Sequence, residues 1–493
     1  MASRVRASRS PASPFVPTPD DPLEAQRAGI RPFEDAEMAL VRAVVTLAPW
    51  IGEPEEHGLR YALNLARTGA LRCADGNDLD LWEFLTPLRE EVRARAVPPL
   101  CRSGGVDRAA VGRLAPPLAA LALEWRKKAL AAFAGRLSPA DLDREVCEKA
   151  LVLVCGGGGG VAWSYLGAFA LLEQYGLVPR LLAGTSMGAV LLLFRARHRR
   201  WRHEEMTTYL DKLTFRGLFR VLRTDSRYGL PAAMRLHLRA GIGEAFCDPG
   251  GRPLSLKDLA IPLVVAVTGV RNGALPRDPS YYEHLLDLQG RVPSPNVMKR
   301  LMSDMLTAIG ELIQQRDRFA RIYLGADAQT HAFDAVDAVG FSSALPGVVH
   351  YDILRDDPRM HALVQELFKR HDLFRLVDGG LVDNLPARAA WRCARSGAIR
   401  SRNAFVLGLE GFGPKLSQPI WFGLEQLAAQ NVARNRPFVH HQRSFQKVLS
   451  PVVLLPSEGD LQRAVRHSKS ELAPDMPFLA RMCRPFPLPL PPS

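Results

Sequence analysis

The sequence has no long apolar run and little cysteine. No stretch approaches the roughly 18 consecutive apolar residues of a transmembrane-helix candidate, and no continuous apolar segment typical of a secretory signal lies near the N-terminus. The 7 cysteines include no C-x-x-C pair, and the 12 histidines include no H-E-x-x-H motif. These absences argue against a disulfide framework and against a zinc site. We therefore expect a cytoplasmic protein without a metal or a cofactor.

The charge balance is basic, with 64 Lys and Arg against 51 Asp and Glu, for a formal net charge of +13. This excess suits an anionic partner surface such as phospholipid, and it is equally what an arginine-rich proteome gives. The hydrophobic share of 47% is ordinary for a globular protein. The length of 493 residues is sufficient for two or three domains.

One segment, residues 151–193, predicts the core of an α/β domain. Residues 151–155 form an apolar run that ends in five glycines, which is typical of a buried strand entering a tight turn. Ser164 to Tyr175 has apolar residues at helical spacing, and Gly176 follows as a stop signal. A second strand over 181–183 and a second helix over 189–197 follow. This order predicts two parallel strands joined by a right-handed crossover.

The second turn has the pattern of a nucleophile elbow. Ser186 stands between a predicted strand and a predicted helix, with Gly184 and Gly188 two residues away on either side. A serine on such a sharp turn needs neighbours without a Cβ atom, because the backbone is crowded there. The pattern alone is weak, but in this strand–turn–helix context it favours catalysis over a structural turn.

The first turn, with its five glycines, allows three interpretations. A phosphate-binding P-loop would end in Gly-Lys-Ser/Thr, which is not present. Residues 157–162 fit the dinucleotide fingerprint. That fingerprint also expects an acidic residue about twenty positions later to hold the ribose, and the sequence has no Asp or Glu between Glu173 and Glu204. The third interpretation is an oxyanion hole, because consecutive glycines expose backbone amides in front of a helix N-terminus.

A serine nucleophile also needs a base, and Asp378 is the best candidate. It ends an apolar run and precedes Gly379 and Gly380, so it should lie at a strand-to-turn junction. An Asp-Gly-Gly turn by itself is usually only a turn. Together with the glycine run and the elbow, it favours a catalytic role.

At this point the chain resembles the patatin-like phospholipase family. The resemblance rests on the glycine run 156–160, on Gly184-Thr-Ser-Met-Gly188, on Asp378-Gly379-Gly380, and on the Ser/Pro-containing segment Ala338 to Gly347. It extends over roughly residues 149–410. It implies a three-layer α/β/α fold with a mostly parallel sheet.

The family resemblance also implies a function and a set of site residues. The implied activity is hydrolysis of acyl esters of lipids, of the phospholipase A or lysophospholipase type, by a Ser–Asp dyad without histidine. The implied partner is a phospholipid or another acyl lipid, and no nucleic acid. The residues that correspond are Ser186 as nucleophile, Asp378 as general base, Gly157, Gly158 and Gly159 as oxyanion donors, Gly184 and Gly188 at the elbow, and Gly379 and Gly380 after the base.

The sequence departs from the family pattern after the glycine run. The family usually has Lys or Arg and then Gly there, whereas this chain has Val161 and Ala162. Loss of the cation would weaken anion stabilisation or contact with a lipid head group, unless the extra glycines re-form the loop. The departure leaves open a non-catalytic lipid-binding or scaffold protein with the same fold.

A second alternative is the triad of an α/β-hydrolase, because Ser186, Asp378 and His440 occur in the required chain order. In that fold, however, the oxyanion loop follows an earlier strand that is well separated from the elbow. Here a single crossover separates the two turns, which favours the dyad.

Residues 214–225 predict an amphipathic helix, with apolar residues at i, i+3, i+4 and i+7 from Phe215 to Leu222 and arginines at positions 216, 220 and 223. Packing against the sheet is the favoured interpretation. Peripheral contact with an anionic membrane surface is the alternative.

The expected organisation has four parts. They are a disordered tail (1–31), a helical N-terminal region (32–148), a catalytic domain (149–410) with an insertion at 271–321 that could form a lid, and a helical C-terminal extension with a proline-rich tail (411–493).

Overall fold

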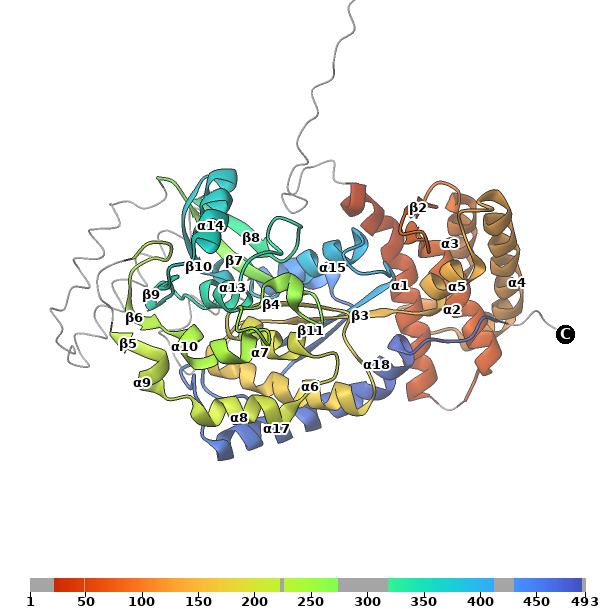
Figure 1. The fold of residues 1–493 in the computed structure, drawn as a ribbon. Coiled ribbons are helices and arrows are strands. Elements are labelled where there is room, and N and C mark those ends of the chain that lie inside the picture. The colour runs from red at the N-terminus through yellow and green to blue at the C-terminus, as the bar shows by residue number, and fades with distance from the viewer. Residues whose placement is uncertain (1–21, 48, 222–225, 274–317, 412–429, 490–493) are drawn as a thin grey trace, which may run out of the picture.

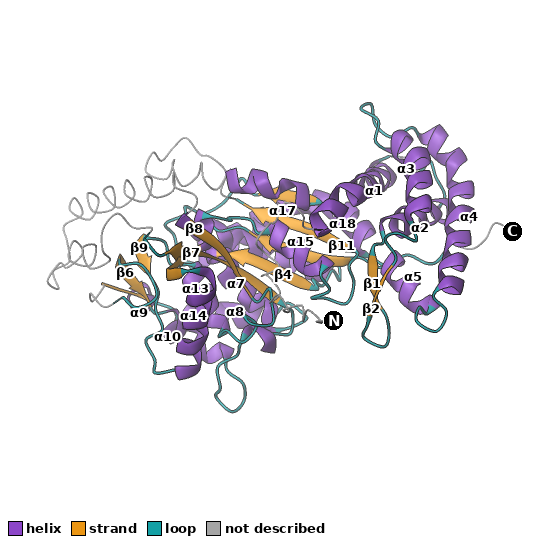
Figure 2. Cartoon of the chain, turned by 90° about the horizontal axis from the view of Figure 1, so that it is seen from above, coloured by secondary structure: helices purple, strands orange, loops and turns teal. Residues whose placement is uncertain are grey.

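The structure is a computed structural model, and it describes residues 22–47, 49–221, 226–273, 318–411 and 430–489. A central sheet carries helices on both faces, and a bundle of helices from the N-terminal part lies at one end of it (Figures 1 and 2). The predicted α/β class with a mostly parallel sheet and a helical N-terminal region is confirmed.

The central sheet has seven strands among the described residues. Five of them, in the order β12, β11, β3, β4 and β7, run parallel to one another, while β8 and β10 are antiparallel to β7. The strands are β3 (Ala150–Cys155), β4 (Leu181–Thr185), β7 (Leu263–Arg271), β8 (Phe319–Leu324), β10 (Leu373–Asp378), β11 (Ala404–Glu410) and β12 (His441–Ser444).

Strands β4 and β10 lie end to end along the same edge of β7. The first half of β7 pairs with β4 and the second half pairs with β10, while β8 pairs with residues of both halves along the opposite edge. Thr185 at the end of β4 pairs with Ala266, and Asp378 at the end of β10 pairs with the next residue, Val267. The register of β7 therefore brings the residue after β4 next to the last residue of β10.

The two faces of the sheet bury separate sets of apolar side chains, as the two-residue period of a strand requires. On β3, Leu151 and Leu153 belong to the core with α6 and α7, whereas Val152 and Val154 belong to the core with α15. A strand buried on both faces explains the continuous apolar run in the sequence. The helices on the first face are α6 (Tyr165–Gln174), α7 (Ser186–Arg197) and α13 (Ala335–Ser342), and α15 (Ala387–Arg395) covers the other.

Smaller elements surround the carboxyl ends of the parallel strands. A three-stranded sheet contains β5 (Phe219–Val221), β6 (Ala232–Leu236) and β9 (Gly347–His350). The nearby helices are α8 (His203–Lys212), α9 (Phe215–Leu218), α10 (Leu238–Ile242) and α14 (Pro358–His371).

The amphipathic helix predicted over residues 214–225 is wrong beyond its first turn. Helix α9 ends at Leu218, and Phe219 begins strand β5, where it pairs with Leu236 of β6. Pairing with a neighbouring strand outweighs a helical pattern of apolar residues in this segment. Residues 222–225 lie outside the described residues.

The N-terminal helical region has its own apolar core. Its elements are α1 (Pro22–Thr46), α2 (Glu53–Arg67), β1 (Ala70–Arg72), β2 (Asp78–Asp80), α3 (Thr86–Leu100), α4 (Arg108–Ala132) and α5 (Pro139–Cys147). Helix α1 begins at Pro22, so residues 22–31 are helical where we expected disorder. The Arg27 guanidinium lies 5.4 Å from the centre of the Trp391 ring on α15 and donates a hydrogen bond to the Pro437 carbonyl. These contacts fix the helix against the α15 side of the sheet, which explains the difference.

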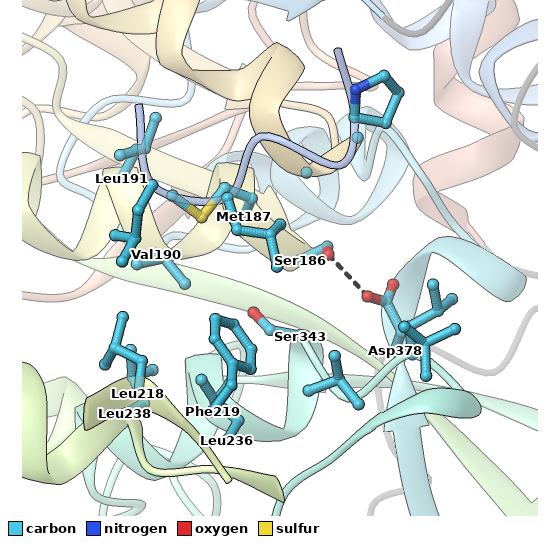
Figure 3. Close-up of a pocket in the computed structure, with 18 of the residues that line it drawn as sticks. Ser186, Met187, Val190, Leu191, Leu218, Phe219, Leu236, Leu238, Ser343 and Asp378 are labelled. Carbon is cyan, nitrogen blue, oxygen red and sulfur yellow. Dashed lines mark hydrogen bonds between the residues drawn. The ribbon is translucent and has the colours of Figure 1, made fainter. Parts of the chain in front are cut away.

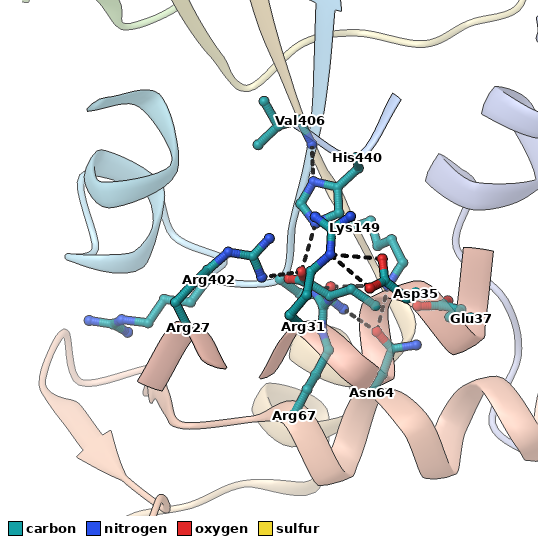
Figure 4. Close-up of polar contacts among 12 residues, drawn as sticks. Arg27, Arg31, Asp35, Glu37, Asn64, Arg67, Lys149, Arg402, Val406 and His440 are labelled. Atoms are coloured by element: carbon teal, nitrogen blue, oxygen red, sulfur yellow. Dashed lines mark hydrogen bonds and ion pairs between the residues drawn. The ribbon is translucent and has the colours of Figure 1, made fainter. Parts of the chain in front are cut away.

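Buried charges connect this region to the sheet (Figure 4). The Lys149 ammonium lies 2.7 Å from Glu37 on α1, and it donates a hydrogen bond of 3.1 Å to Asn403, next to β11. Burial lowers the pKa of Lys149 to about 7. Although burial opposes it, the cations of Lys149 and Arg60 lower the pKa of Glu37 to about 2. A paired charge network thus fixes the helical region against the start of β3.

The C-terminal part includes the helices α17 (Glu458–Leu472) and α18 (Met476–Cys483). Helix α17 packs on α6 and α18 reaches α1 (Figure 1). Most of the expected insertion 271–321 lies outside the described residues, as do residues 1–21 of the tail and residues 412–429 of the C-terminal part. None of the helices in the described ranges is long and apolar enough to span a bilayer.

Candidate active site

Ser186 and Asp378 meet where β4 and β10 approach each other along β7 (Figure 3). The Ser186 hydroxyl donates a hydrogen bond of 2.7 Å to Oδ2 of Asp378. The two residues are 192 positions apart in the sequence, so the fold alone brings them together. The contact joins the two groups that serine chemistry requires, a hydroxyl and a proton acceptor.

The turn at Ser186 is as sharp as its two flanking glycines predict. Ser186 has φ of 53°, and Asp372 is the other described non-glycine residue with a positive φ. A Cβ atom on Gly188 would lie 2.9 Å from the carbonyl oxygen of Cys155 and would collide with that of Gly156. A Cβ atom on Gly184 would lie 2.9 Å from Cα of Ala189. The strained backbone that presents the Ser186 hydroxyl therefore depends on glycine at both positions.

A serine from helix α13 supports this turn. The Ser342 hydroxyl accepts a hydrogen bond of 2.8 Å from the Ser186 amide and donates one of 2.6 Å to the Ala266 carbonyl. It thereby connects the elbow to β7. The sequence indicated the segment Ala338 to Gly347, but no pattern in it distinguished Ser342 from Ser343.

Asp378 is held on three sides. Its Oδ1 accepts a hydrogen bond of 2.7 Å from the Gly380 amide, and its main-chain carbonyl accepts one of 2.7 Å from the Thr268 hydroxyl. A Cβ atom on Gly379 would collide with the carbonyl oxygen of Ala266. Both glycines of the Asp-Gly-Gly motif therefore orient the carboxylate toward Ser186.

Burial raises the pKa of Asp378 to about 6, and the hydrogen bonds from Ser186 and Gly380 lower it in part. A carboxyl group in an apolar site binds a proton more readily than one in water. A pKa of about 6 suits a general base, because the group is ionised at neutral pH and still holds a proton in the transition state.

The glycine loop contributes backbone to the surroundings of Ser186. The amide of Gly157 donates a hydrogen bond of 3.3 Å to the Asn384 carbonyl, so its N–H group already has an acceptor. The amides of Gly158 and Gly159 have no acceptor within the described part of the chain. Both residues have positive φ, of 142° and 56°, and both line the same cavity as Ser186.

A cavity of about 440 Å³ opens beside Ser186 and Asp378. Asp378 is the one ionisable residue among its described lining residues. Such a lining suits an apolar chain better than a charged group. The apolar side chains that line it include Trp163 and Phe194. Others are labelled in Figure 3, namely Met187, Val190, Leu191, Leu218, Phe219, Leu236 and Leu238.

The residue in place of the family cation is packed into the protein. Val161 is 2% exposed. A Cβ atom on Gly411 would lie 2.6 Å from Val161 and 3.1 Å from Val448, so the two valines lie side by side. The C-terminal part of the chain covers the position where the family has Lys or Arg. Pro451, Val452, Leu454 and Leu455 of this part also line the cavity, and no pattern in the sequence indicated them.

His440 and His441 make other contacts than those of a catalytic triad. His440 accepts a hydrogen bond of 2.9 Å from the Val406 amide and lies 3.2 Å from Glu34 (Figure 4). His441 lies 3.2 Å from Asp475. Two strands, β3 and β11, separate β12 from β4, so both histidines are structural parts of the sheet edge.

Within the described ranges, no group of three or more His, Cys, Asp or Glu side chains is arranged to hold a metal ion.

Comparison with known families identifies one domain of this chain. A search of curated proteins finds no significant match. Residues 153–391 match the model of the patatin-like phospholipase family, a range that contains the glycine loop, the elbow and the Asp-Gly-Gly turn. This chain therefore carries a patatin-like phospholipase domain.

Proposed function

We propose that the protein hydrolyses carboxylic esters of acyl lipids, as a phospholipase A or lysophospholipase does, with Ser186 as nucleophile and Asp378 as general base. The observation that carries this proposal is the hydrogen bond of 2.7 Å between the two side chains beside an apolar cavity. A protein that only bound lipid would have no need for a buried carboxylate against a strained serine.

The proposed reaction has two halves. Asp378 accepts the proton of Ser186 as the hydroxyl oxygen attacks the ester carbonyl. The amides of Gly158 and Gly159 stabilise the negative oxygen of the tetrahedral intermediate. Asp378 then gives the proton to the leaving alcohol, and an acyl-enzyme remains. Water attacks this ester in the same way and releases the fatty acid.

The Gly157 amide has a lesser part in this scheme than the family resemblance implied. It holds the loop against Asn384, and the next two amides complete the oxyanion site. The dipole of the short helix that begins at Gly159 adds to their effect in the same direction.

The test is an assay of the purified protein against a lipid panel. The panel contains phosphatidylcholine, phosphatidylglycerol, lysophosphatidylcholine and a triacylglycerol, and released fatty acid is measured. We expect release from at least one ester, and none above background from the Ser186→Ala variant. Equal release by the two proteins, or no release from any ester, would contradict the proposal.

The pH dependence should report the titration of Asp378. Because burial raises the pKa of Asp378 to about 6, protonation should remove the base below that pH. We expect kcat/KM for an uncharged ester to fall about tenfold per pH unit below pH 6 and to level off above pH 7. Circular dichroism at each pH serves as the control for unfolding. A profile that stays flat from pH 7 to pH 5 would contradict the assignment of the base.

We also propose peripheral contact with an anionic membrane surface, at the mouth of the cavity. Phe215 and Val452 both line the cavity and are 50% and 60% exposed. Arg216 and Arg220 are exposed beside Phe215. Apolar side chains can enter the interface while arginines contact anionic head groups.

The Phe215→Ser variant should bind more weakly to vesicles that contain 30% phosphatidylglycerol. Full burial of a Phe side chain contributes about 1.5 to 3 kcal/mol, and Phe215 is 50% exposed, so the partition coefficient should fall by about threefold to tenfold. Val178→Ser is the matched control, since Val178 is 38% exposed and is not among the lining residues. Equal co-sedimentation of both variants would place membrane contact elsewhere.

A further inference from the structure

The glycine loop is in direct contact with a segment from the C-terminal part of the chain, Ser450–Leu455. The Gly160 amide donates a hydrogen bond of 3.0 Å to the Pro451 carbonyl. A Cβ atom on Gly160 would lie 2.6 Å from the carbonyl oxygen of Val453 and would collide with that of Ser450. A Cβ atom on Gly159 would collide with the Pro451 carbonyl oxygen. The last two glycines of the run thus permit backbone-to-backbone packing.

This segment is anchored at both of its ends. On its N-terminal side, β12 pairs with β11 in the central sheet, and the Phe445 amide donates a hydrogen bond of 2.8 Å to the Glu410 carbonyl. On its C-terminal side, α17 crosses α6 so closely that a Cβ atom on Gly167 would collide with the Ser468 hydroxyl. Two rigid elements therefore fix the position of Ser450–Leu455 over the loop.

The side chains of the segment form part of the cavity. Pro451, Val452, Leu454 and Leu455 line it together with Ser186. Leu454 lies against the glycine loop, because a Cβ atom on Gly159 would be 3.5 Å from its Cδ2 atom. An acyl group bound with its carbonyl at the Gly158 and Gly159 amides would pass beside this leucine.

We propose that Ser450–Leu455 is a specificity-determining wall of the active site, which holds the glycine loop in place and limits the bulk of the acyl group through Leu454. The segment lies outside the family match at residues 153–391. The proposal explains the departure after the glycine run. Where the family has a cation and a glycine, this chain packs a second segment on the loop. The inference rests on the ester hydrolysis proposed above.

Two variants test the two parts of this proposal, with p-nitrophenyl acetate and p-nitrophenyl palmitate as substrates. Leu454→Phe should reduce the ratio of kcat/KM for palmitate to kcat/KM for acetate by about tenfold or more, because added volume near the carbonyl obstructs the longer chain. Leu454→Ala should change the ratio in the opposite direction. Leu354→Phe is the matched control, since Leu354 is 54% exposed and is not among the lining residues.

Gly160→Ala should lower kcat for both esters by about 100-fold, because displacement of the wall shifts the adjacent oxyanion amides. Gly160 does not have a positive φ, so alanine brings no backbone strain at this position, and the variant tests only the collision of the new Cβ atom with the segment. Gly459→Ala is the control, with nothing within 4 Å of the added Cβ atom. If wild type cleaves neither ester, the proposed function fails. If wild type cleaves both, and Leu454→Phe and Gly160→Ala match their controls, the wall proposal is overturned.

Discussion

Replacing Ser186 by alanine or Asp378 by asparagine should reduce kcat for ester hydrolysis by about 10⁴-fold or more, because each change removes one half of the dyad. Stopped assays with a p-nitrophenyl ester measure this over the required range. Both variants should fold. Burial raises the pKa of Asp378 to about 6, so the folded protein binds the proton more tightly than the unfolded chain does, in which the pKa is about 4. The free energy of unfolding therefore falls as the pH rises from about 4 to 6 and Asp378 becomes ionised. The neutral asparagine should therefore leave Tm unchanged or raise it.

The controls for this prediction are His440→Ala and His441→Ala. Both histidines contact groups at the sheet edge, His440 at Val406 and Glu34, and His441 at Asp475. Their replacement should lower Tm and leave kcat of the folded fraction within a few-fold of wild type. Retained activity in Asp378→Asn, together with a loss in His440→Ala, would assign the site to a triad instead.

A second large effect is expected at Gly188. In Gly188→Ala the new Cβ atom would collide with the carbonyl oxygen of Gly156 and would lie 2.9 Å from the carbonyl oxygen of Cys155. Both oxygens belong to the backbone at the end of β3, so neither can move unless the strand shifts. We expect kcat to fall by about 100-fold or more, since a shift of about 1 Å at the nucleophile has this effect. Overpacking should also cost about 1 to 3 kcal/mol of unfolding free energy. Activity assays and urea unfolding of the same preparation measure both.

Gly459→Ala is the control for the general effect of adding a methyl group, because the added Cβ atom would meet nothing within 4 Å. A Gly188→Ala protein with wild-type kcat and Tm would show that the elbow does not need glycine. The close packing of α7 on the end of β3 would then have no catalytic role.

The local parts of the site could be predicted from the sequence because each has a local cause. The run at residues 151–155 is apolar without alternation because β3 is buried on both faces. Gly184 and Gly188 are glycines because the backbone on either side of Ser186 is crowded. Asp378 is the last residue of strand β10, at the strand-to-turn junction where the sequence predicted it.

The parts that depended on distant segments could not be predicted. Phe219 fits a helical pattern, yet it pairs with Leu236 in a strand, and only the tertiary structure provides that partner. Nothing local indicates that β10 lies in line with β4 along β7, which is what places Asp378 beside Ser186. Likewise, no pattern within Ser450–Leu455 indicates that this segment lines the cavity. The packing is reflected only in the loop that the segment covers, where Gly159 and Gly160 have no room for a Cβ atom.

The central claim is that Ser186 is a nucleophile activated by Asp378. Labelling with a fluorophosphonate probe, followed by peptide mass spectrometry, tests it most directly, because the probe reacts with activated serines and needs no knowledge of the lipid. We predict one modified residue, Ser186, with labelling lost in Ser186→Ala and slowed by about 100-fold or more in Asp378→Asn, in line with the known contribution of a general base. Modification of a different serine, or equal labelling rates in wild type and Asp378→Asn, would contradict the account.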